Sequence, residues 1–203
     1  MIISSRGVRM MFLPVALALV VACQTRQGHA QPHNLLGNGG FETVAADQKG
    51  PQGWDATILP RTSGVVAFGW DNQIAHSGTR SVSVSIQAAH PDEKVAYNWT
   101  RTVPQCEPGE TYELRAWIRT KGLTTPAFVA IQCWDSAKTN MLGFATTQEK
   151  YPLKGTTDWT QVHTTFSVPD KAGEVRVRAG ISAPENRGGK VWFDDICITQ
   201  VSR

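Results

Sequence analysis

Residues 111–120 read Thr-Tyr-Glu-Leu-Arg-Ala-Trp-Ile-Arg-Thr, a run in which apolar and polar side chains alternate one by one. Neighbouring side chains on a β-strand point to opposite faces, so this period of two predicts a strand with one buried face. The apolar face carries Tyr112, Leu114, Ala116 and Ile118. The opposite face carries Glu113, Arg115, Trp117 and Arg119.

Two further runs, Ala127–Trp134 and Glu174–Ser182, repeat this pattern. Their inward positions are Val129, Ile131, Cys133, Val175, Val177, Ala179 and Ile181. Their outward positions include Gln132, Trp134, Arg176 and Arg178. A Trp on the polar face of a strand exposes a large apolar ring, which calls for an explanation. One explanation is a sugar ring stacked on the indole with its hydroxyl groups paired to Arg and Gln, and the other is that loops simply cover the Trp.

More short β-rich segments follow along the chain, separated by turn signals such as Pro108-Gly109, Lys154-Gly155 and Gly188-Gly189. The predicted strands are Ser81–Ile86, Val95–Val103, Thr160–Val168 and Val191–Val201, with weaker patterns at Leu35–Glu42, Val65–Trp70 and Leu142–Thr146. No segment keeps a helical period. The sequence therefore predicts an all-β fold, a β-sandwich forming one domain over residues 34–203.

The N-terminus has the features of an export signal in residues 1–22, where Arg6 and Arg9 precede a short apolar run. Cys23 follows this run directly, as in a bacterial lipobox, and would then be lipidated and followed by a polar tether over residues 23–33. Cleavage after Ala30 is the alternative. Either cleavage predicts an extracytoplasmic protein, which contacts a membrane only through a lipid on Cys23.

The charge balance gives no sign of a nucleic-acid partner. The formal net charge is +3, from 20 basic and 17 acidic residues, and the signal contains two of the basic residues. No cluster of Lys and Arg remains to form a basic patch.

Three cysteines follow the signal, namely Cys106, Cys133 and Cys197. Export permits disulfides, but an odd number leaves at least one thiol free and the sequence does not give the pairing.

Several short motifs resemble the carbohydrate-binding modules of the CenC-like group, families 4, 9 and 22. The motifs are Asn34 to Glu42 (NLLGNGGFE), Gly53-Trp54, His76 to Val82 (HSGTRSV), Glu107 to Leu114 (EPGETYEL), Thr157-Asp158-Trp159 and Gly189 to Ile196 (GKVWFDDI). Together they cover nearly all of the chain after the signal. The resemblance implies a jelly-roll β-sandwich of two antiparallel sheets, of the galactose-binding-like type.

The resemblance also implies a structural Ca²⁺ where the first and last strands meet. Matched position by position, its ligands would be Gly40, Glu42, Ser77, Arg80 and Asp194. Calcium takes hard oxygen ligands, including backbone carbonyls, which suits this set. Ser77 stands where the family often has an acidic residue, and this lowers the charge of the predicted site.

The sugar cleft implied by the resemblance lies on one face of the sandwich. The candidate binding residues are Trp117, Trp134, Arg115, Gln132, Arg176, Arg178 and Trp99. The direction of Trp99 depends on the strand: if Val103 points inward and the strand is regular, Trp99 also points inward, and one bulge would reverse this.

Nothing in the sequence predicts catalysis. Asp194 and Asp195 are neighbours on a predicted strand, so they face opposite sides and cannot flank one glycosidic bond. Nucleophile-elbow, metalloprotease and phosphate-loop motifs are absent from the sequence. The sequence thus favours non-catalytic binding of a polysaccharide or oligosaccharide. A structural or protein-interaction domain on the same fold is the alternative, and a glycoside hydrolase ranks last.

Overall fold

The computed structural model describes residues 33–59, 65–88, 96–182 and 186–201. Every regular element in these residues is a β-strand. The described residues contain no helix long and apolar enough to cross a membrane. The strands are β1 (Asp55–Leu59), β2 (Val66–Asp71), β3 (Ser81–Ile86), β4 (Ala96–Thr102), β5 (Thr111–Leu123), β6 (Ala127–Asp135), β7 (Met141–Thr146), β8 (Gly155–Ser167), β9 (Ala172–Ser182) and β10 (Lys190–Gln200).

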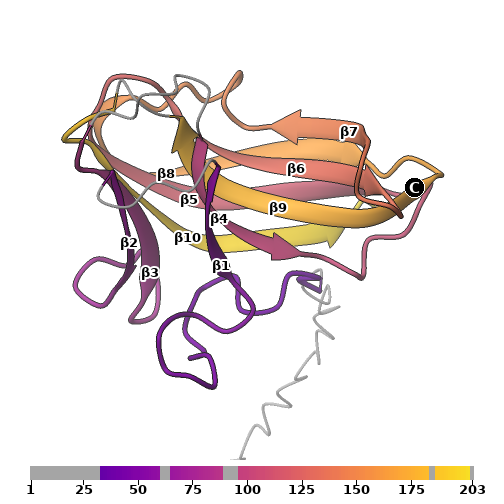
Figure 1. Ribbon diagram of the computed structural model, residues 1–203, viewed down its shortest axis with the longest axis horizontal. Coiled ribbons are helices and arrows are strands. Elements are labelled where there is room, and N and C mark those ends of the chain that lie inside the picture. Colours follow the sequence, from indigo (N-terminus) through magenta and orange to yellow (C-terminus); the bar gives the residue numbers. More distant parts are fainter. Residues whose placement is uncertain (1–32, 60–64, 89–95, 183–185, 202–203) are drawn as a thin grey trace, which may run out of the picture. The chain divides into compact units, whose positions relative to one another are not determined.

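The strands form two five-stranded sheets, here called sheet I and sheet II. Sheet I has the order β1-β4-β9-β6-β7 and sheet II has the order β2-β3-β10-β5-β8. All the strand pairs in both sheets are antiparallel. Figure 1 shows the strands of sheet I lying over those of sheet II. The predicted fold, a jelly-roll sandwich of two antiparallel sheets, is confirmed.

The core between the sheets includes the inward side chains predicted by alternation. Leu114, Ala116 and Ile118 from sheet II and Val129 and Ile131 from sheet I are all fully buried there. Burying one aliphatic side chain of this size stabilises a fold by about 1.5–3 kcal/mol before chain entropy is counted. The two sheets therefore share one continuous apolar layer, and each presents its polar face outward.

The N-terminal segment differs from the prediction. Leu35–Glu42 is a run of turns and not a strand, because Asn38 and Phe41 adopt left-handed backbone angles with φ of 53° and 59°. The Asn38 side chain holds this conformation, since its oxygen accepts a hydrogen bond from the Thr43 N–H at 2.9 Å. The structure adds one strand that the sequence did not predict, β1, which pairs with β4 at the edge of sheet I.

Candidate functional site

The outward face of sheet I collects polar and aromatic side chains in rows that run across the strands. In one row Arg178 on β9 pairs with Thr100 on β4 and with Ala130 on β6. In the next row Gln132 on β6 lies between Arg176 on β9 and Phe144 on β7. Side chains that are far apart in sequence are therefore neighbours on one surface.

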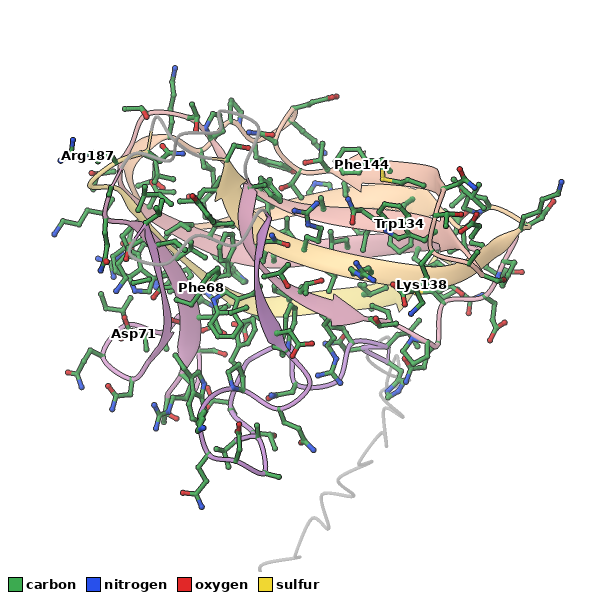
Figure 2. The ribbon with its side chains drawn as sticks, viewed as in Figure 1. Phe68, Asp71, Trp134, Lys138, Phe144 and Arg187 are labelled. Carbon is green, nitrogen blue, oxygen red and sulfur yellow. The ribbon has the colours of Figure 1, made fainter. Side chains whose placement is uncertain are left out.

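This face is hollowed. One hollow of about 310 Å³ is lined by Thr57, Asn98, Thr100, Gln132, Trp134, Arg176 and Arg178. A second hollow of about 450 Å³ shares Thr57, Thr100 and Arg176 with the first and extends toward the start of β1. We call the two together the sheet I groove. Figure 2 shows Trp134, Lys138 and Phe144 at the same end of this sheet.

The floor of the groove is a hydrogen-bonded set of polar side chains. Asn98 is buried, and its oxygen accepts a hydrogen bond from Arg178 Nε at 2.7 Å. The Asn98 amide donates to the carbonyl of Thr57 on the edge strand at 3.2 Å. Gly180 lies opposite Asn98 in β9, where an added Cβ would come within 2.6 Å of the Asn98 Cβ. The same Cβ would lie 2.2 Å from the Tyr97 carbonyl oxygen, so any larger residue at position 180 would push β4 and β9 apart.

Trp134 provides the aromatic wall of the groove. Its indole Nε1 donates to Gln132 Oε1 at 3.3 Å, which fixes the ring beside the buried amide. The Gln132 amide nitrogen makes no hydrogen bond to a described residue, so it remains available to a ligand. Phe144, next to Gln132 in register, leaves 57% of its surface exposed. Two aromatic rings and an amide donor thus share this end of the face.

The charges beside Trp134 centre on Glu174. The Glu174 side chain is buried; its Oε2 lies 2.5 Å from Lys138 Nζ and its Oε1 accepts a hydrogen bond from Arg176. Burial raises the pKa of Glu174, but the hydrogen bond from Lys138 and the charge of Arg176 outweigh it and hold the pKa below its usual range. Burial lowers the pKa of Arg178, and the neighbouring charge of Arg176 lowers it further.

The structure brings together four of the seven candidate sugar-binding residues. Trp134, Gln132, Arg176 and Arg178 all line the sheet I groove. Asn98, Thr57, Thr100 and Phe144 belong to the same face and were not among the candidates. The strand alternation held a signal for Asn98, because an inward Trp99 places its neighbour Asn98 outward.

The remaining three candidates lie elsewhere. Trp117 and Arg115 belong to β5 and so face outward from sheet II, on the opposite side of the sandwich from Trp134. Trp117 stacks on the ring of His76 with centroids 3.8 Å apart, and Arg115 pairs with Glu113 at 2.5 Å. Alternation shows whether a side chain faces the core but not to which sheet its strand belongs, which explains why the structure separates Trp117 and Arg115 from Trp134.

Trp99 is a core residue, as the regular-strand alternative predicted. Its ring is buried and its Nε1 donates to the carbonyl of Ser83 in sheet II at 3.0 Å. Phe68 packs edge-on against the same ring at 5.6 Å between centroids. Trp99 therefore joins the two sheets and is not available to a ligand in the groove.

Two of the residues predicted to bind calcium, Glu42 and Asp194, accept hydrogen bonds from the same loop, residues 76–80. Glu42 accepts hydrogen bonds from the backbone N–H groups of Thr79 and Arg80, each at 2.9 Å. Asp194 accepts from the N–H groups of His76 and Ser77 at 2.8 and 3.2 Å. Within the part of the chain that the structure describes, no three His, Cys, Asp or Glu side chains group as a metal site. The predicted set contains only two such side chains, Glu42 and Asp194, so calcium stays a prediction.

The other predicted features are only partly within the described residues. Cys23, the predicted lipidation site, lies outside them, as do the signal and most of the tether. Cys106, Cys133 and Cys197 are described and carry free thiols, the first two of them buried.

A two-sheet sandwich with an aromatic and amide-lined groove on an outer sheet face has the architecture of a ligand-binding module. The sequence profile of a family described as a carbohydrate binding domain matches residues 33–185. The chain therefore belongs to this carbohydrate-binding domain family, as the short motifs indicated.

Individual relatives are distant. The tRNA nuclease WapA of Bacillus subtilis (strain 168) is 28% identical over 164 residues, which are 80% of this chain and 7% of that protein. The chain thus spans only a small part of the curated relatives it matches. Among solved structures, the CBM22-1 xylan-binding domain from Paenibacillus barcinonensis Xyn10C has a TM-score of 0.58 at 13% identity, covering 85% of this chain and 97% of that one. TmCBM61 in complex with β-1,4-galactotriose has a TM-score of 0.50 at 16% identity, covering 83% and 99%. These likenesses concern the fold.

Proposed function

We propose that this protein binds a polysaccharide or oligosaccharide in the sheet I groove, without transforming it. The observation that carries the proposal is the combination of Trp134 with a hydrogen-bonded polar floor in one hollow of about 310 Å³. A pyranose has apolar C–H faces and a rim of hydroxyl groups. A site that binds it therefore needs an apolar surface and hydrogen-bonding groups within the width of one sugar ring.

The aromatic side chains would provide stacking. Trp134 is held by its hydrogen bond to Gln132, so little side-chain entropy is lost when a sugar lies against the ring. Phe144 is more exposed and offers a second apolar surface beside the same amide. A second ring beside the groove suits a chain of sugars better than a single monosaccharide.

The polar side chains would select hydroxyl groups. Amide and guanidinium groups arranged on a rigid sheet act as fixed donors and acceptors, which is how small polar ligands are oriented in binding sites. Gln132 and Arg178 lie on the adjacent strands β6 and β9, and the buried Asn98 on β4 orients Arg178. Their spacing is set by the β-ladder, so a bound sugar would not have to organise them.

The charges beside the sheet I groove support binding over hydrolysis there. A glycosidase needs a carboxylic acid with a raised pKa beside a second carboxylate. Glu174, the buried carboxylate at this end of the sheet, has its pKa held below the usual range by Lys138 and Arg176. Such a group stays ionised near neutral pH and is a poor proton donor.

Export and anchoring are part of the proposal and rest on residues 1–23 alone. A lipid on Cys23 would hold the module at a bacterial envelope, where polysaccharides are met outside the cytoplasm. Mass spectrometry of the N-terminal peptide from membranes of expressing cells tests this. An acylated peptide beginning at Cys23 is expected, and a free N-terminus after Ala30 would show soluble secretion instead.

The experiment for binding is affinity electrophoresis of the purified protein in gels containing different soluble polysaccharides. Trp134→Ala is compared with Trp117→Ala, the same change on the outer face of the other sheet. Wild type and Trp117→Ala should be retarded by the same polymer, and Trp134→Ala should not. If the folded wild type is retarded by no polysaccharide, the interaction-domain alternative replaces this proposal.

A further inference from the structure

Arg178 holds a positive charge in the groove that no carboxylate neutralises. Its Nε donates to the neutral oxygen of Asn98, and Arg178 forms no ion pair with any acidic residue among those described. Its terminal Nη atoms make no hydrogen bond to a described residue. The guanidinium group is half-buried and lines the groove. Two nitrogen atoms with their N–H groups are thus left for a ligand.

The neighbouring charges do not supply the missing counter-ion. The ionisable side chains lining the two hollows are Asp55, Arg101, Arg176 and Arg178, three cations against one anion. Arg176 is paired with Glu174, and Arg101 donates to the carbonyl of Gln52 at 2.8 Å. Asp55 belongs to the second hollow and makes no ion pair with a described residue. Arg178 is therefore the cation of the first hollow that has no anionic partner.

A half-buried guanidinium without a counter-ion favours an anionic ligand. Arginine stays charged at all physiological pH values, so it cannot relieve the loss of hydration by releasing a proton. A carboxylate can accept two parallel hydrogen bonds from the planar guanidinium group of arginine, which is a strong and directional pairing. The Arg176 charge adds to the positive potential at the same place, since it lowers the pKa of Arg178.

We propose that the sugars bound in the sheet I groove include uronic acids, whose carboxylate pairs with Arg178 while the pyranose ring lies against Trp134. This inference rests on the proposed function, because it names the substrate class of the same site. The surrounding donors and acceptors, Asn98, Gln132 and Thr100, are neutral. Within the first hollow, Arg178 is the one described cation without an anionic partner, which matches the single carboxylate of a uronic acid better than the denser charge of a sulfated glycan.

The test measures dissociation constants for glucuronoxylan, polygalacturonate and alginate, each beside its carboxyl-reduced neutral form. Dextran sulfate is included as a general polyanion. The variants are Arg178→Gln, Arg178→Lys and Arg119→Gln. Arg119 lies on sheet II next to the exposed Asp158 at 3.7 Å, so its change removes one positive charge away from the groove. Melting temperatures confirm that each variant is folded.

We expect wild type to bind at least one uronate polymer tenfold or more tightly than its carboxyl-reduced form. Arg178→Gln should weaken binding of the uronate polymer at least fivefold more than binding of its reduced form and so remove most of this preference, Arg178→Lys should retain part of it, and Arg119→Gln should bind like wild type. Equal binding of both forms, or equal binding of dextran sulfate, would overturn the uronate inference and leave sugar binding intact. Binding to no polymer of either kind would overturn both.

Discussion

Substituting Glu174 by Gln tests the ion pairs that hold the end of the groove next to Trp134. Glu174 is the anion shared by Lys138 and Arg176, and only 6% of its side chain is exposed. Glutamine has nearly the same shape, but it carries no charge, and its amide group would place N–H donors against one of the two cations. The change therefore removes the electrostatic part of both contacts while keeping the packing.

The size of the effect follows from the exposure of the partners. Breaking a fully buried ion pair costs about 3–5 kcal/mol, and a surface pair contributes about 0–1 kcal/mol. Lys138 is 58% exposed and Arg176 is 34% exposed, so each contact belongs near the upper end of the surface range. We expect Glu174→Gln to lose about 1–2 kcal/mol of stability. For a domain of this size that corresponds to a fall in Tm of roughly 2–8 °C.

The effect should depend on pH in a definite direction. The pKa of Glu174 in the folded protein lies below the unfolded value of 4.5. A carboxylate with a depressed folded pKa contributes stability that is complete above the unfolded pKa and is lost as the pH falls through the folded one. The difference between wild type and Glu174→Gln should therefore be full near neutral pH and shrink in acid, where wild type is protonated and resembles glutamine.

The assay is urea unfolding followed by tryptophan fluorescence, with stability taken from the linear dependence on denaturant. Glu149→Gln, at an exposed position, is the matched control and should match wild type. Two results would refute the reasoning. One is a Glu174→Gln protein as stable as wild type near neutral pH, and the other is a loss that stays undiminished in acid.

The remaining predictions concern the core thiols and calcium. Burial, with the nearby Cys133 and Glu107, raises the pKa of the Cys106 thiol to about 12. A thiol reagent near neutral pH should therefore modify Cys106 only after the protein unfolds. Fast reaction of Cys106 in the folded protein would contradict its burial. The calcium predicted from the family resemblance implies that chelation lowers the Tm measured by calorimetry. An unchanged Tm would show that the N–H donors around Glu42 and Asp194 are sufficient without a metal.

The sequence was a good guide to the faces of the strands and a poor guide to which faces lie together. Alternation in residues 111–120 correctly separated buried Leu114 from outward Trp117, because a strand that borders a core must alternate. It could not show that Trp117 and Trp134 lie on different sheets, since strand order depends on long-range pairing. Trp117 therefore stacks on His76 on the outer face of sheet II, away from the sheet I groove.

Two local errors have local physical causes. Leu35–Glu42 looked strand-like from its apolar residues, but the left-handed angles at Asn38 and Phe41 turn the backbone. The edge strand β1 is short, and its identity comes from pairing with β4 rather than from its own sequence. Among the groove residues, Asn98 was predictable, because the alternation that places Trp99 inward places Asn98 outward. Thr57 was not predictable, because it reaches the groove only through the pairing of β1 with β4.

The most direct test of the account is a titration of the protein with a bound oligosaccharide, observed through the indole N–H signals of its tryptophans in a ¹⁵N NMR spectrum. Each signal is assigned by substituting one tryptophan at a time. The Trp134 signal should shift on binding, while the signals of Trp117 and the buried Trp99 should stay in place. A shift of the Trp117 signal with the Trp134 signal unchanged would place the ligand on sheet II and contradict the assignment of the groove.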